Sequence, residues 1–146
     1  MRRGASLALG FAAGFLAVLL FHQPGVGLLR VLELGAGAPY AMQAIPPLGV
    51  PRVISLAFWG GVWGIVFAIL RPYLPRRGRA FLLAGFLFGA LAPTFFGWFV
   101  LAPLGGRPVA QGWQIANMWR GPLLNGLFGF GTALLLLGAG RFTRGH

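Results

Sequence analysis

Two arginines, each close to a proline at the start of a long apolar stretch, are the residues whose type and spacing could bind a ligand. Arg52 follows Pro51 directly, and Arg120 precedes Pro122 by two residues. Proline suits the first turn of a helix, and the free amides of a helix N-terminus attract anions. Three amide side chains near Arg120 add hydrogen-bonding groups: Gln114, Asn117 and Asn125. Together these residues predict a polar site for an anion such as a lipid phosphate or a carboxylate.

The same cluster has a second interpretation, which the sequence leaves open. Both arginines could extend to the lipid headgroups without forming a site, and Asn125 could form a hydrogen bond to a neighbouring helix. Trp113 and Trp119 flank the amides, and tryptophan gathers at membrane surfaces. In that case the cluster marks the edge of the membrane and binds nothing.

His22 and Glu33 are the other candidates for chemistry. A histidine and a carboxylate can exchange a proton, but Glu33 is the only acidic residue and the chain has two histidines and no cysteine. Their number and spacing predict no metal site, and no phosphate-binding glycine loop or catalytic triad motif is present, so we expect no cofactor. The sequence therefore favours a protein without enzymatic activity, and an enzyme acting on lipid would depend on His22 or Glu33.

Four long stretches without Asp, Glu, Lys or Arg must position these groups. A membrane span needs about 20 mainly apolar residues, and each stretch is close to that length. They predict an all-α membrane protein in which residues 1–146 form a single membrane domain with four transmembrane helices. The predicted spans are 4–22, 53–70, 80–102 and 121–140, and the predicted outer loops are 23–52 and 103–120. Within the first outer loop, residues 26–34 resemble a short helix lying along the membrane surface.

All 12 basic residues are arginines, and they lie at the ends of the spans. Eight belong to the N-terminus, the second loop and the tail: Arg2, Arg3, Arg71, Arg76, Arg77, Arg79, Arg141 and Arg144. Four belong to the outer loops: Arg30, Arg52, Arg107 and Arg120. Arginine accumulates on the cytoplasmic side of membrane proteins, so this bias predicts two cytoplasmic termini. The predicted partners of these charges are the bilayer and its anionic lipids, with no nucleic acid.

Small residues recur at every fourth position in each predicted span. Helices in lipid associate by close approach of their backbones, which small residues allow. The spacing therefore predicts a compact four-helix bundle, although some repeats arise by chance among 25 glycines. The glycines expected at the helix contacts are Gly10, Gly14, Gly60, Gly64, Gly85, Gly89 and Gly129.

The spans also resemble one another in pairs. Residues 10–16 align with 85–91 at an offset of 75, and Gly61–Gly64 with Ala68 aligns with Gly126–Gly129 with Ala133 at an offset of 65. This pattern predicts a duplicated helical hairpin whose two copies run in the same direction. Shared membrane composition is the alternative explanation, and the sequence does not decide between them.

The stretch PPLGVPRVISLAFWGGVWG at residues 46–64 resembles a segment of a family of small four-span bacterial membrane proteins without known activity, and LAPLGGR at 101–107 is similar to the same proteins. The resemblance implies a bacterial inner membrane. The small-residue faces and the missing catalytic groups favour a self-associating bundle or an accessory subunit of a membrane complex. The alternative is a small channel or transporter for an anionic or lipid-like molecule, using Arg52, Arg120 and Asn125.

Overall fold

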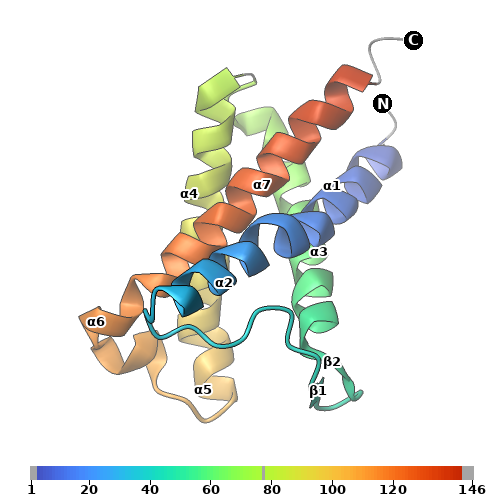
Figure 1. Cartoon of the computed structure of the whole chain (residues 1–146). Helices are drawn as coiled ribbons and strands as arrows, with labels where there is room; N and C mark the ends of the chain where they lie inside the picture. The colour runs from blue at the N-terminus through green and yellow to red at the C-terminus, as the bar shows by residue number, and fades with distance from the viewer. Residues whose placement is uncertain (1–2, 77, 143–146) are drawn as a thin grey trace.

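The protein is a bundle of membrane-spanning helices. The computed structural model describes residues 3–76 and 78–142, with the backbone alone at 141 and 142. Within these residues four helices are long and apolar enough to cross a membrane: Arg3–Val31, Arg52–Tyr73, Gly78–Leu104 and Ile115–Gly140. They pack into a compact bundle (Figure 1). The predicted all-α class with four spans is confirmed.

Each span is assembled from shorter elements that follow one another along the chain. The first contains α1 (Arg3–Ala17), the π-helical turn η1 (Val18–His22) and α2 (Gln23–Val31). A two-stranded antiparallel hairpin, β1 (Ala44–Ile45) and β2 (Val50–Pro51), leads into α3 (Arg52–Leu70) and the 3₁₀ turn η2 (Arg71–Tyr73). The third contains α4 (Gly78–Phe96), the π-helical turn η3 (Gly97–Leu101) and α5 (Ala102–Leu104). The 3₁₀ segment η4 (Val109–Trp113) then precedes α6 (Ile115–Met118) and α7 (Arg120–Phe142).

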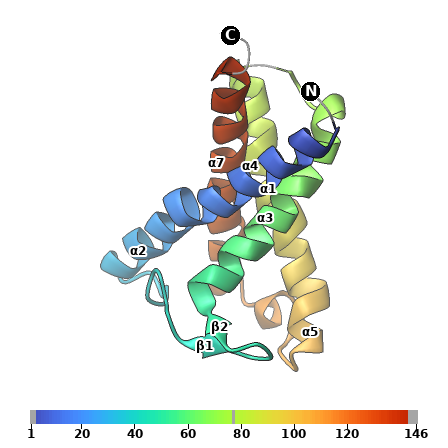
Figure 2. The same ribbon diagram turned by 90° about the vertical axis from the view of Figure 1, so that its right-hand side faces the viewer.

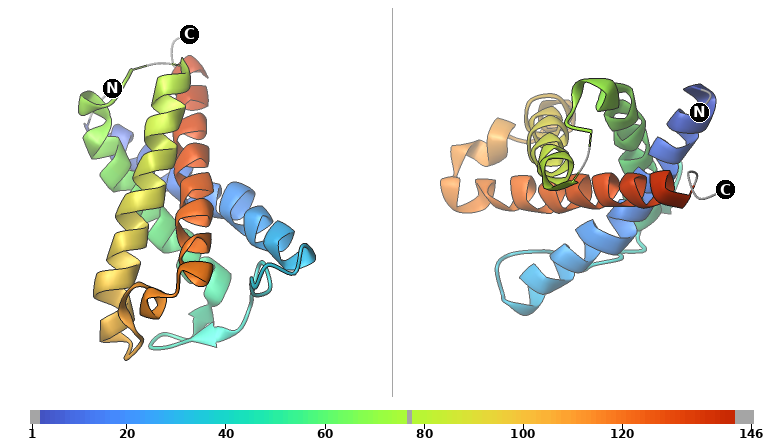
Figure 3. Two further views of the ribbon diagram at one scale, coloured as in Figure 1. Left: turned by 90° about the vertical axis from the view of Figure 1, so that its left-hand side faces the viewer. Right: turned by 90° about the horizontal axis from the view of Figure 1, so that it is seen from above.

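The two ends of the bundle differ in what they hold. The start of α1, η2 and the end of α7 lie at one end, which we call the terminal end (Figures 1 and 3). The strands, α5 and α6 lie at the other, which we call the loop end. Three of the arginines assigned to the first group, Arg2, Arg77 and Arg144, lie outside the described residues, as does the side chain of Arg141.

Glycines bring the helices into backbone contact within each hairpin. A Cβ atom on Gly10 of α1 would lie 2.7 Å from the carbonyl oxygen of Gly64 and 2.7 Å from the Cβ of Ala68, both on α3. A Cβ on Gly85 of α4 would lie 2.6 Å from the carbonyl oxygen of Gly129 on α7. Such distances leave no room for a side chain. All seven glycines expected at helix contacts are buried at these two crossings.

The contacts of the two hairpins repeat at the offsets seen in the sequence. Gly10 against Gly64 and Ala68 corresponds to Gly85 against Gly129 and Ala133. Two aromatic contacts correspond in the same way: the Phe11 ring covers Gly61, and the Phe86 ring covers Gly126. The first and second halves of the bundle are therefore packed in the same way, as a duplicated hairpin requires.

A π-helical turn interrupts the first helix of each hairpin near its loop end. The N–H of Gln23 donates to the carbonyl of Val18, and the N–H of Ala102 donates to the carbonyl of Gly97, so both bonds span five residues. The residue after each donor is a proline, Pro24 or Pro103. The helix continues past both prolines, which lie in the first turn of α2 and of α5.

The first span extends beyond the residue at which the sequence predicted its end. It runs to Val31, so residues 23–31 of the expected outer loop are helical. At about 1.5 Å per residue, its 29 residues extend for about 43 Å, which exceeds the hydrocarbon thickness of about 30 Å. Figure 2 shows this helix strongly inclined to α7, with α2 projecting from the bundle. Residues 26–31 of the segment expected along the membrane surface thus continue the helix of the first span.

Candidate functional site

Two adjoining cavities open between the helices at the loop end. The first has a volume of about 510 Å³ and is lined by the loop-end parts of the first, second and fourth spans and by residues 35–38. The second has a volume of about 490 Å³ and lies between the third and fourth spans. Gln111, Asn117 and Gly121 line both, so the two cavities share a wall.

Two arginines border the first cavity, one from α3 and one from the start of α7. The guanidinium of Arg120 donates from Nη1 to the carbonyl oxygen of Gly35 and from Nη2 to Oδ1 of Asn117. In the described part of the chain, the exposed Arg52 guanidinium has no hydrogen-bond or ion-pair partner. Glu33, the only carboxylate side chain of the sequence, does not line the cavity. Two uncompensated guanidinium groups therefore make this cavity electropositive, which suits a phosphate or a carboxylate.

A chain of amide hydrogen bonds holds Arg120 in place. Nδ2 of Asn117 donates to Oε1 of Gln114 at 2.9 Å, which leaves Oδ1 of Asn117 to accept from Arg120. Gln114 precedes α6, Asn117 lies within it and Arg120 begins α7, and the two hydrogen bonds join these three side chains in a row. The guanidinium is thereby oriented before any ligand arrives, which lowers the entropic cost of binding.

The helix N-termini do not supply the free amides that the sequence led us to expect. The N–H of Arg52 donates to the carbonyl of Gln43 at 3.0 Å, and the N–H of Val53 donates to the carbonyl of Ala41 at 2.9 Å. Arg120 is preceded by α6, and the N–H of Leu123 donates to the carbonyl of Trp119 at 3.2 Å. The prediction of free terminal amides is wrong at these positions, because residues before each helix cap it. Attraction of an anion rests on the side chains instead.

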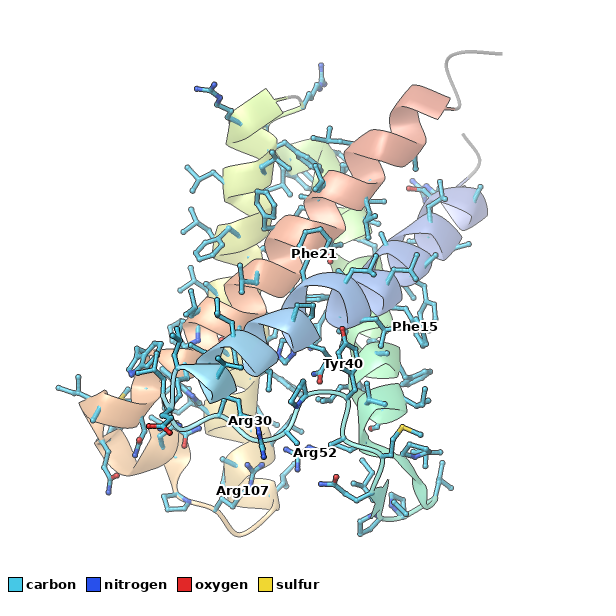
Figure 4. The ribbon with its side chains drawn as sticks, viewed as in Figure 1. Phe15, Phe21, Arg30, Tyr40, Arg52 and Arg107 are labelled. Atoms are coloured by element: carbon cyan, nitrogen blue, oxygen red, sulfur yellow. The ribbon has the colours of Figure 1, made fainter. Side chains whose placement is uncertain are left out.

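Residues that the sequence analysis did not select build the outer wall of the first cavity. Gln23 is 3% exposed, and its Oε1 accepts a hydrogen bond from the backbone N–H of Tyr40 at 2.7 Å. The Tyr40 hydroxyl donates to the carbonyl of Leu19 at 2.7 Å. Figure 4 shows Tyr40 beneath the first span, with Arg52 nearer the loop end. These two bonds attach Tyr40 to the first span, and residues 35–38, 41 and 43 on either side of it line the cavity. A buried glutamine at the end of an apolar stretch was the available sequence signal.

The remaining predicted site residues line the second cavity. Asn125 and Gln114 line it, together with Thr94, Trp98 and Arg107. Nδ2 of Asn125 donates to Oγ1 of Thr94 at 2.9 Å, which links α7 to α4. Of the residues predicted to act together, Arg52, Arg120 and Asn117 thus share the first cavity, whereas Gln114, Asn117 and Asn125 share the second. Arg107, which the sequence analysis assigned only to topology, belongs to the second cavity.

The two residues considered for proton transfer are placed differently from each other. His22 lines the first cavity, and its Nδ1 is 3.1 Å from Nε2 of Gln23. Glu33 lies beyond the end of α2, where its backbone has a φ of 57° and its N–H donates to the carbonyl of Arg30. Among the described residues, no three His, Asp or Glu side chains come together as metal ligands would.

Comparison of the chain with protein-family models, with curated proteins and with solved structures gives no match. The function must therefore be inferred from the chemistry of the cavities themselves. They combine guanidinium groups at the mouth with amide and hydroxyl groups deeper in the bundle. Such a combination can bind and orient a polar ligand, and it contains no nucleophile activated by a neighbouring base.

Proposed function

We propose that this chain is a small membrane transporter or channel for an anionic or lipid-like molecule, whose phosphate or carboxylate it binds at the loop end. The observation that carries the proposal is the first cavity, which Arg52 and Arg120 border without an opposing carboxylate. Its volume of about 510 Å³ is within the usual range for small-molecule sites. Arg120 is already held by Gly35 and Asn117, while the guanidinium of Arg52 is free to meet a ligand.

The competing function, a self-associating bundle or an accessory subunit, drew its support from the small-residue faces. In the structure the seven glycines of those faces lie between helices of one chain, at the α1–α3 and α4–α7 crossings. These seven glycines are therefore occupied by contacts within one chain and do not offer a face to a second copy. Binding at the loop end is therefore the better supported function.

The proposal includes an orientation, with the loop end outside a bacterial inner membrane and both termini in the cytoplasm. The distribution of arginine supports it, because eight of the 12 belong to the N-terminus, the loop between the second and third spans and the C-terminal tail. The cavities then face the outer surface, where a solute or a lipid headgroup of the outer leaflet reaches them without crossing the membrane.

Binding of inorganic phosphate to the full chain in nanodiscs of zwitterionic lipid tests the proposal. We expect Arg52→Gln to weaken binding by about 10- to 100-fold, because a hydrogen bond to a charged group contributes about 1.5 to 3 kcal/mol. Arg76→Gln is the matched control, since Arg76 is exposed at the terminal end and lines neither cavity. Equal weakening by the two substitutions would show nonspecific charge attraction and overturn the proposal. Phosphate flux into proteoliposomes, measured with the same variants, then tests transport.

A further inference from the structure

The second cavity differs from the first in the chemistry of its deeper wall. Thr94 is 2% exposed and accepts a hydrogen bond from Asn125, and both side chains are uncharged. A Cβ on Gly121 would lie 3.7 Å from Nε1 of Trp98, so the indole nitrogen lies close to the start of α7. Asn125 follows Arg120 by five residues, which places it about 7.5 Å further into the membrane along the helix. Neutral polar groups thus lie below the charged mouth.

The repeat of the two hairpins is broken at this polar pair. At the offset of 65 residues, the position in the first hairpin that corresponds to Asn125 is Gly60, and the space above Gly60 is filled by Val18 and by the backbone of Gly14. In the first hairpin, the space at this position is therefore filled by apolar packing alone. The other hairpin keeps the close backbone approach, since a Cβ on Gly89 would overlap the carbonyl oxygen of Asn125, but it adds the side chains of Asn125 and Thr94 and has a cavity beside them. Helix packing by itself therefore does not require the polar pair.

We propose that the two cavities hold a single ligand in which an anionic group is joined to an uncharged, hydroxyl-bearing group. This inference rests on the proposed function, because it assigns the anionic group to Arg52 and Arg120. The uncharged group occupies the second cavity. Glycerol phosphate, either free or as the headgroup of a lipid, has this chemistry. Gln111, Asn117 and Gly121 line both cavities, so the cavities adjoin and the two groups of such a ligand would lie on either side of these residues.

The hydrogen-bonding capacity of the second cavity matches hydroxyl groups better than a second anion. The Thr94 hydroxyl still has its proton to donate after accepting from Asn125, and Asn125 retains one N–H and its carbonyl oxygen. A hydroxyl group donates and accepts, so it can satisfy both kinds of group, whereas an anion would leave the carbonyl oxygen unpaired. Arg107 is the charged residue that lines this cavity in the described part of the chain, and it is exposed in the loop.

Titration of the full chain in phosphatidylcholine nanodiscs with inorganic phosphate and with glycerol 3-phosphate tests this inference. We expect glycerol 3-phosphate to bind at least about tenfold more tightly, the factor that one well-formed hydrogen bond provides. Thr94→Val, which keeps the shape of the side chain, should remove this gain and leave the phosphate affinity unchanged. Thr132→Val is the matched control, because Thr132 is buried, donates to Phe128 of its own helix and lines neither cavity.

The outcomes separate the two proposals. If phosphate binds through Arg52 but glycerol 3-phosphate gains nothing, or if Thr94→Val leaves the gain intact, the bipartite ligand is wrong and the anion site remains. If neither compound binds, the proposed function fails as well. A second titration identifies the source of the group: phosphatidylglycerol added to the nanodiscs should compete with glycerol 3-phosphate if the natural ligand is a lipid. Undiminished binding of glycerol 3-phosphate in those nanodiscs would identify the ligand as a soluble molecule.

Discussion

At the level of single residues, the first cavity depends on a backbone carbonyl that its own helix leaves free. In an α-helix the carbonyl of Leu19 would accept from the N–H of Gln23, but that N–H donates to Val18 in the π-helical turn. The next nitrogen along the chain belongs to Pro24, which has no hydrogen to donate. The hydroxyl of Tyr40 supplies the missing hydrogen bond. The π-helical turn thereby provides the carbonyl to which the segment around Tyr40 is attached.

This arrangement predicts a specific effect of Tyr40→Phe. The substitution removes the donor to Leu19, so we expect the free energy of unfolding to fall by about 1 kcal/mol and residues 35–43 to exchange amide hydrogens faster. Pro24→Ala restores an N–H that can reach the Leu19 carbonyl, and the loss caused by Tyr40→Phe should be smaller in that background. Thermal unfolding in detergent and hydrogen exchange measure both effects. If Tyr40→Phe lowered the free energy of unfolding equally with and without Pro24→Ala, the proposed role of the free Leu19 carbonyl would be contradicted.

The residue scale also shows what the sequence could reveal about the site. Arg52 and Arg120 were identifiable because they are charged residues beside prolines at the edge of apolar stretches, a pattern that depends only on neighbours in the chain. The carbonyl of Gly35 was not identifiable, because it reaches the cavity through the path of residues 32–43. A backbone carbonyl carries no signature in the residue type. The partners of Arg120 could therefore be found only in the structure.

At the level of helices, close backbone approach decides the stability of each hairpin. A Cβ on Gly64 would lie 3.0 Å from the Cα of Gly14 and would also overlap the carbonyl oxygen of Gly10. We expect Gly64→Ala to lower the free energy of unfolding by about 1 to 3 kcal/mol, because the helices must separate to admit the methyl group. The apparent melting temperature in mild detergent measures the loss.

Gly138→Ala provides the control for this substitution. Gly138 also lies in a helix, α7, but a Cβ there would meet nothing within 4 Å. Alanine is the better helix former by about 1 kcal/mol, so we expect this variant to be as stable as the parent chain or more stable. If Gly64→Ala and Gly138→Ala changed the melting temperature equally, helix propensity rather than packing would govern both, and the close crossing would lose its importance.

Helix ends were harder to predict than helix positions, for a physical reason. The apolar stretches identified all four spans, since burial in lipid depends on composition over about 20 residues. The first span was predicted to end at residue 22, two residues before Pro24, and proline ends most helices. In the structure the π-helical turn shifts the bonding by one residue, so that the helix passes through a position where no N–H is required. The rule that proline ends a helix failed here because the preceding π-helical turn had changed the pattern of backbone hydrogen bonds.

At the level of the whole molecule, the two hairpins meet mainly along the first and fourth spans. Phe21 of η1 covers Gly131 of α7, and its ring lies 6.2 Å from that of Phe130 in an edge-on arrangement. This contact places His22 and Gln23 beside the start of α7, so the first cavity forms only when both hairpins are present. Neither hairpin alone contains the pair of arginines on which the proposed binding depends.

The orientation of the bundle can be tested with single cysteines, because the chain has none of its own. Leu48 and Ile115 at the loop end are each 84% exposed, and Tyr73 at the terminal end is 85% exposed, so cysteines at these positions are equally accessible to reagent. We expect a membrane-impermeant maleimide to label Leu48→Cys and Ile115→Cys in intact spheroplasts. Tyr73→Cys should react only after the membrane is permeabilised. The expectation rests on the bias of arginine toward the N-terminus, the α3–α4 loop and the tail, which favours the cytoplasm for these segments.

Each pattern of labelling has a definite consequence for the proposed function. Labelling of Tyr73→Cys alone in intact spheroplasts would show that the bundle has the opposite orientation. Arg52 and Arg120 would then receive their ligand from the cytoplasm. Labelling of Leu48→Cys without Ile115→Cys would place the two loops on opposite sides, which contradicts four spans and separates Arg52 from Arg120. The expected pattern requires both loops to be outside, and this is the only arrangement in which an external anion meets the two guanidinium groups together.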